Sequence, residues 1–184
     1  MDNLRQLIYA SLCSALMIAG AHLKIPIGPV PIVLTNFVVM LAGLILGAKW
    51  GLASVGIYLL LGIVGLPVFA GGSGLAYVFG PTGGYLLAFL PAVAIFGLIS
   101  SGKKRLLWRD AAALVCGSIL IYMIGVPWLK VAAELTWESA ISAGMLPFLL
   151  GDAAKIVAAV ATVAIIGRIY PELLLRPGFT NQQP

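Results

Sequence analysis

Residues 145–168 read "MLPFLLGDAAKIVAAVATVAIIGR", an apolar run whose charged members are Asp152, Lys155 and the final Arg168. A transmembrane helix needs about 20 consecutive, mostly apolar residues. The run is therefore long enough to cross a bilayer. It also places a carboxylate and an ammonium group where lipid or a protein core would surround them.

Composition decides which solvent this run meets. The chain has 184 residues, of which 61% are hydrophobic and 9% charged, and its mean hydropathy is +1.09. A soluble domain carries roughly 25% charged residues. The sequence therefore predicts an all-α integral membrane protein, with six transmembrane helices in one compact bundle formed by residues 1–184. The predicted spans are 4–22, 33–47, 51–66, 84–100, 110–128 and 145–168; "GAKWG" separates the second from the third.

The distribution of lysine and arginine predicts the orientation in the membrane. Short cytoplasmic loops carry an excess of these residues. With both termini on one side, that side has eight of them and the other has Lys24 and Lys130. The sequence therefore predicts cytoplasmic termini in a cell membrane, and the loops near 23–32, 67–83 and 129–144 outside. The eight residues are Arg5, Lys49, Lys103, Lys104, Arg105, Arg109, Arg168 and Arg176.

Several function classes find no support in the sequence. The net charge of +5 reflects the loop lysines and arginines, so no nucleic-acid partner is expected. His22 is the only histidine, and Cys13 and Cys116 stand alone, which predicts no metal site and no cofactor. Residues 97–104 resemble a phosphate-binding loop but have lysine in place of its serine or threonine. Residues 71–74 resemble an intramembrane serine protease motif, but a suitably placed base is missing, so no enzyme is predicted.

Small residues recur every four positions along the first predicted helix, at Ser11, Ala15 and Ala19. Rows of this kind let a second helix approach closely within a membrane. Two interpretations stay open from the sequence. The row packs inside the bundle, or it is an exposed docking face for another membrane protein.

The loops predicted outside differ from ordinary connections. Residues 24–33 contain three prolines, and residues 65–85 contain seven glycines. Glycine-rich backbone can approach a ligand closely or adopt positive φ. The two loops are either tight turns or a lid over an outward-facing binding pocket.

Asp152 and Lys155 lie three residues apart and so share one helix face. An ionised group inside a membrane costs several kcal/mol unless it is paired or solvated, and it often marks a site. The pair either neutralises itself near the helix end or forms part of a ligand site. In the second case Asp152 accepts from ligand N–H groups and Lys155 meets a carboxylate.

Five blocks of sequence resemble a known family. They are "GPVPI" (28–32), "LAGLILG" (41–47), "GLPVFAGGSG" (65–74), "GPTGGYLLAF" (80–89) and "GDAAK" (151–155). In this order they resemble the biotin-specific substrate-binding subunits, often called BioY, of energy-coupling-factor vitamin transporters. The resemblance implies a pocket that opens outward and captures biotin. It also implies a membrane-embedded coupling subunit and two cytoplasmic ATPase subunits that power uptake by tilting of the binding subunit.

The resemblance also implies roles for individual residues. Asp152 and Lys155 match the acid and the lysine that take part in biotin binding. Ala15 and Ala19, in the row that begins at Ser11, correspond to the face that docks on the coupling subunit. The family often has "PVPITLQT" where residues 29–36 read "PVPIVLTN", which leaves open the polar group that the second helix contributes. The remaining candidate contacts to biotin are Gly71, Gly72, Ser73, Gly74, Tyr77, Tyr85 and Asn36.

Two other functions stay open at this stage. The first is the same transporter class with another vitamin, such as thiamine or riboflavin, because the fold is shared while the pockets differ. The second is a small channel or facilitator with an occluded charged pair. A binding subunit retains its ligand through purification, whereas a channel conducts without tight binding.

Overall fold

The computed structural model describes residues 2–26, 28–101 and 106–169, and these are mostly helical. The prediction of a helical membrane protein is confirmed at this level. Four stretches are long and apolar enough to cross a bilayer, namely Asn3–His22, Thr35–Ile63, Leu107–Ala132 and Trp137–Ile169. The elements in chain order are α1 (Asp2–His22), β1 (Lys24–Ile25), β2 (Ile32–Val33), α2 (Thr35–Ile63), α3 (Gly74–Val78), α4 (Gly83–Ile99), α5 (Leu107–Ala132), α6 (Trp137–Gly144) and α7 (Leu146–Ile169).

The helix α2 covers most of two predicted spans, 33–47 and 51–66, and a sharp break at Gly47 divides it. Gly47 has φ 76° and ψ −177°, a conformation that residues with a Cβ rarely adopt. A Cβ added at Gly51 would lie 3.5 Å from the carbonyl oxygen of Ala42. In a straight helix residues nine apart are separated by roughly 13 Å along the axis. The two halves of α2 therefore fold back on each other.

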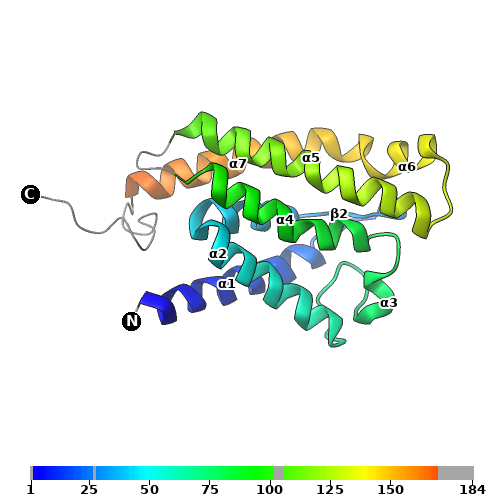
Figure 1. The fold of residues 1–184 in the computed structure, drawn as a ribbon, viewed down its shortest axis with the longest axis horizontal. Helices are drawn as coiled ribbons and strands as arrows, with labels where there is room; N and C mark the ends of the chain where they lie inside the picture. The colour runs from blue at the N-terminus through cyan, green and yellow to red at the C-terminus, as the bar shows by residue number, and fades with distance from the viewer. Residues whose placement is uncertain (1, 27, 102–105, 170–184) are drawn as a thin grey trace, which may run out of the picture.

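The helix α4 lies between α2 and α5 and forms the centre of the helical core (Figure 1). The residues of its inner face are fully buried; they include Ala88, Ala92, Val93 and Phe96. At Gly97 the backbone of α4 touches the turn of α2 so closely that an added Cβ would collide with the backbone of Ala48. The reversal of α2 is thus held by the helix that packs across it.

The long helices share two ends, which lie at opposite sides of Figure 1. We call the end that holds the start of α1, the turn of α2 and the last residue of α7 the terminal end. We call the end that holds β1, β2, α3 and α6 the loop end. Of the eight basic residues predicted on one side, Lys103, Lys104, Arg105 and Arg176 lie outside the described residues.

The loop end contains two short strands and a short helix that the predicted six-helix bundle did not include. Residues Lys24–Ile25 and Ile32–Val33 form a two-stranded antiparallel pair, with Lys24 opposite Val33. The glycine-rich segment contains the short helix α3. Pairing over two residues each is local and adds no sheet layer to the fold.

Candidate functional site

The two charged residues of α7 contact each other in a half-buried position. Lys155 Nζ lies 3.3 Å from Asp152 Oδ1. The Lys155 side chain is 11% exposed and the Asp152 side chain 13%. They face the rest of the protein, because Asn36 of α2 contacts both of them and Tyr122 of α5 contacts Asp152. Desolvated charges of this kind are tolerated when hydrogen bonds satisfy their remaining atoms.

Asn36, in the first turn of α2, joins the two charges. Its Nδ2 donates to Asp152 Oδ1 at 2.8 Å, and its Oδ1 accepts from Lys155 Nζ at 2.8 Å. Lys155 also donates to the backbone oxygen of Val33 at 2.9 Å. The amide can serve both partners because it carries a donor and an acceptor. Asn36 is therefore the residue of α2 that hydrogen-bonds to both charged side chains, and Lys155 is also bonded to the backbone of β2.

Tyr122 of α5 completes the network, and the sequence analysis missed it. Its hydroxyl donates to Asp152 Oδ2 at 2.5 Å. Each oxygen of the carboxylate thus accepts from a different helix. The signal of Tyr122 in the sequence is weak, because a phenol in the middle of a mostly apolar span is typical of a packing residue. We call Asp152, Lys155, Asn36 and Tyr122 the polar network.

Two small cavities lie beside the polar network. The first, of about 60 Å³, is lined by all four members of the network, and the second, of about 50 Å³, by Tyr58, Thr35 and Tyr77. Both cavities lie under the segment that precedes α2. The residues that line both are Val30, Pro31, Val33, Tyr85 and Phe89.

A third cavity, of about 390 Å³, lies at the loop end between residues 24–26 and 28–31 on one side and residues 70–82 on the other. Pro31 and Tyr77 line both this cavity and the second one. Of the glycines predicted to contact a ligand, only Gly71 lines this cavity. Lys24 Nζ donates to the backbone oxygen of Ala70 at 2.5 Å, which joins the two loops. The three cavities therefore form a row from the polar network to the loop end.

The structure brings together some of the predicted site residues and not others. Tyr85 lines the inner cavities and donates to the Gly144 oxygen at 2.8 Å, so it also ties α4 to α6. Gly72, Ser73 and Gly74 line none of the three cavities of this row. An added Cβ at Gly72 would lie 2.7 Å from the Tyr77 ring, and Gly74 has φ 81° at the start of α3. For these three residues a ligand contact stays a prediction.

The small-residue row on α1 is exposed. Ser11, Ala15 and Ala19 all lie on the surface, while Ala10, Met17 and other residues of the opposite face are buried against α2. Of the two interpretations of the row, the structure favours an exposed face over internal packing. Large apolar residues flank the row on the same surface. They are Leu4, Leu7, Ile8, Leu12 and Leu16.

Comparison with known proteins gives consistent matches along the chain. The sequence profile of the BioY family matches residues 1–172. A Thermotoga maritima protein called "Biotin transporter BioY" is 43% identical over 157 residues, which cover 85% of this chain and 92% of that protein. A Pyrococcus horikoshii protein called "Probable biotin transporter BioY" has the same identity and coverage.

A solved structure has the same fold. It is described as the S-component for biotin from an ECF-type ABC transporter, and it is 31% identical in sequence to this chain. The TM-score is 0.84, and the superposition covers 95% of this chain and 97% of that one. The similarity therefore includes all the helices that hold the polar network.

Proposed function

Because this chain belongs to the BioY family, we propose that it is the biotin-binding S-component of an ECF-type transporter. It binds biotin at the outer side of the membrane and hands it to partner subunits that hydrolyse ATP. The observation that carries this proposal is the polar network at the inner end of a row of cavities.

The chemistry of the network suits biotin. The ureido ring of biotin has two N–H donors and a carbonyl acceptor, and its tail ends in a carboxylate. Asp152 supplies an acceptor for N–H groups, and Lys155 supplies a cation for the carboxylate or a donor for the carbonyl. Asn36 can serve as either partner. Phe89 and Tyr85, which line the same cavity, give the apolar thioether ring a surface to pack against.

The ligand site that we propose consists of three parts. The polar network forms its inner end, Tyr77 and Tyr85 form its aromatic walls, and Gly71–Gly74 form its roof. Residues 24–33 close over it as a lid. In this arrangement the pocket opens toward the loop end of the helices.

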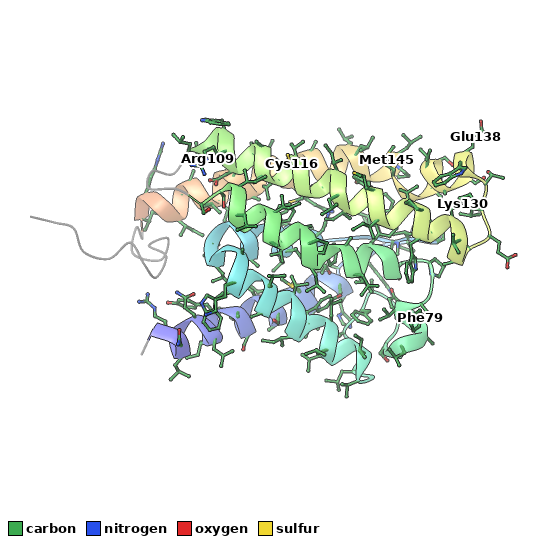
Figure 2. The ribbon with its side chains drawn as sticks, viewed as in Figure 1. Phe79, Arg109, Cys116, Lys130, Glu138 and Met145 are labelled. Atoms are coloured by element: carbon green, nitrogen blue, oxygen red, sulfur yellow. The ribbon has the colours of Figure 1, made fainter. Side chains whose placement is uncertain are left out.

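The charge distribution supports the proposed orientation. Of the described basic residues outside the polar network, Lys24 and Lys130 are at the loop end and the other four are at the terminal end. Figure 2 labels one of each group, Arg109 and Lys130, at opposite ends of α5. By the excess of positive charge in cytoplasmic loops, the terminal end and both chain termini are cytoplasmic. The loop end then faces outward, where the ligand is captured.

We assign partner docking to the exposed row Ser11, Ala15 and Ala19. Small side chains there allow a helix of a membrane-embedded coupling subunit to pack closely. Two cytoplasmic ATPase subunits bound to that coupling subunit supply the energy, since no residue of this chain is assigned to ATP hydrolysis. The site takes neither a metal nor a cofactor in this proposal.

Equilibrium binding of labelled biotin to the purified protein in detergent tests the proposal. We expect tight binding that unlabelled biotin displaces and that thiamine and riboflavin do not displace. Displacement by thiamine or riboflavin would reassign the vitamin. Ion conductance in planar bilayers without biotin binding would identify a channel.

The docking assignment has a separate test. Ala15→Phe is expected to keep biotin binding and to abolish ATP-driven uptake in vesicles that contain the partner subunits. The matched control is Ala158→Phe, which makes the same change at an exposed position of α7, away from the row on α1. Equal uptake by the two variants would contradict the assignment.

A further inference from the structure

A groove of about 520 Å³ lies outside the proposed ligand row, on the flank formed by α5, α6 and α7. On α5 it is lined by Val115, Ile119 and Met123, which are four residues apart and form one exposed ridge. On α7 the facing ridge contains Leu149 and Ala153. Figure 2 shows Met145, which also lines the groove, beside α5.

The length of the groove matches one leaflet of a bilayer. It runs along α5 from Val115 to Pro127, a rise of roughly 18 Å. Half of a hydrocarbon core of about 30 Å is about 15 Å. Toward the loop end the groove is bordered by Trp137, whose ring lies 5.4 Å from Lys130 Nζ. Tryptophan is enriched at the boundary between hydrocarbon and headgroups, so this end lies at headgroup depth.

Three kinds of occupant can be compared for this groove. Water is disfavoured, because a cavity with an apolar lining stays dry. The coupling subunit is assigned to α1, which lies on the opposite side of the molecule from α5 and α7 (Figure 1). A lipid acyl chain is apolar and flexible, and the surrounding bilayer supplies it.

The groove also touches the proposed ligand site. Tyr122 and Asp152 line both the groove and the cavity beside Lys155. Asp152 accepts from Asn36 with Oδ1 and from Tyr122 with Oδ2. The Tyr122–Asp152 hydrogen bond is therefore the partition between the lipid-facing flank and the ligand cavity.

We propose that this groove binds one acyl chain of a phospholipid from the leaflet at the loop end. The chain forms the lateral wall of the ligand cavity behind Tyr122 and Asp152. It keeps water from reaching the carboxylate from the side, and electrostatic interactions are stronger where water is excluded. Lys130 and Glu138, of opposite charge, lie near the headgroup position, so no headgroup charge is selected (Figure 2).

Native mass spectrometry of the full chain tests lipid binding without biotin. The protein is purified in detergent after reconstitution with dioleoylphosphatidylcholine, the lipid probe. We expect one retained phospholipid per protein in the wild type. Ala153→Phe fills the groove and should lower lipid occupancy at least 5-fold. Ala154→Phe is the matched control, since Ala154 is the next residue, is also exposed and does not line the groove.

Equal retention by the two variants, or no retained lipid in the wild type, would overturn the proposal. Ala153→Leu adds less volume and should give an intermediate loss, which keeps the test usable if the phenylalanine variant does not fold. The wall role has its own readout. Stripping lipid from the wild type should weaken biotin binding about 10-fold, and the added lipid probe should restore it.

Unchanged affinity after stripping would overturn the wall role. The wall role rests on the proposed function, whereas lipid retention does not. A protein that retains the lipid and never binds biotin would therefore refute the proposed function and leave the acyl-chain site in place.

Discussion

The polar network and the glycine-rich segment 65–85 border the same row of cavities by opposite means. In the network, side chains from three helices satisfy one another, and charge is balanced within 3.3 Å. In the glycine-rich segment, backbone lies close to aromatic rings, as Gly72 does to Tyr77. The network holds charged and polar groups in place, and the glycine-rich segment determines the shape of the cavity wall. We therefore expect the largest losses of biotin affinity and stability where a charged side chain loses its partner, and smaller losses where an aromatic ring must move.

Asp152→Asn should have the largest effect. It leaves the Lys155 ammonium without a carboxylate in a membrane-spanning helix, and removing one partner of a buried pair costs about 3–5 kcal/mol. We expect at least a 100-fold loss of biotin affinity and a lower melting temperature. Equilibrium binding and thermal unfolding in detergent measure the two effects.

The double variant Asp152→Asn with Lys155→Met sharpens this result. It removes both charges, so the melting temperature should recover toward the wild type while biotin binding stays lost. Near-normal affinity in either the single or the double variant would show that the pair is structural and does not bind the ligand.

Tyr122→Phe is expected to have the next largest effect. A hydrogen bond to a charged group contributes about 1.5–3 kcal/mol, and the variant removes only the hydroxyl that donates to Asp152. Biotin affinity should fall about 10-fold in an equilibrium binding assay. Tyr9→Phe is the control, because Tyr9 accepts a hydrogen bond from Arg5 near the terminal end. If both variants bind equally well, Tyr122 does not position the carboxylate.

Gly72→Ala tests the glycine-rich segment. The added methyl would lie 2.7 Å from Tyr77 Cδ2, and the Tyr77 ring is stacked on Phe69 with centroids 5.3 Å apart. Overpacking of this kind costs about 1–3 kcal/mol, so affinity should fall about 5-fold. Gly56→Ala is the matched control, since nothing lies within 4 Å of an added Cβ there and Gly56 lines none of the three cavities. The contrast between the regions would fail if Gly72→Ala were as damaging as Asp152→Asn.

Lys24→Gln should have the smallest effect. It weakens the bond from Nζ to the Ala70 oxygen between the two outer loops, at an exposed position. A single exposed hydrogen bond contributes about 0.5–1.5 kcal/mol. Biotin should dissociate about 3-fold faster in a release assay. Lys130→Gln, the other basic residue of the loop end, should leave the rate unchanged.

The sequence predicts best the features that depend on one helix at a time, namely the positions of the helices and the contacts within a helix. Apolar runs overlap the observed helices, and the spacing of Asp152 and Lys155 predicts their contact because both lie on one helix. The chain reversal near "GAKWG" also follows from the interruption of the apolar pattern. Its cause, positive φ at Gly47, is local to the sequence.

The contacts that the sequence could not predict join different helices. Tyr122 looks like any core aromatic until α5 is packed against α7. The Val33 carbonyl that accepts from Lys155 belongs to the backbone, which carries no sequence signal. The roles of Gly72, Ser73 and Gly74 depend on how a loop folds over a cavity, so they stay predictions until the substitutions are measured.

The two-residue pairing of β1 and β2 has a consequence for ligand exchange. Val30 and Pro31, which lie between these strands, line both inner cavities, so we expect a molecule to reach Lys155 by displacing these residues. So short a ladder is cheap to open, and the helices need not unfold. Because Lys155 donates to the Val33 oxygen of β2, we expect movement of this strand to free one N–H donor of the ammonium for an oxygen atom of the ligand.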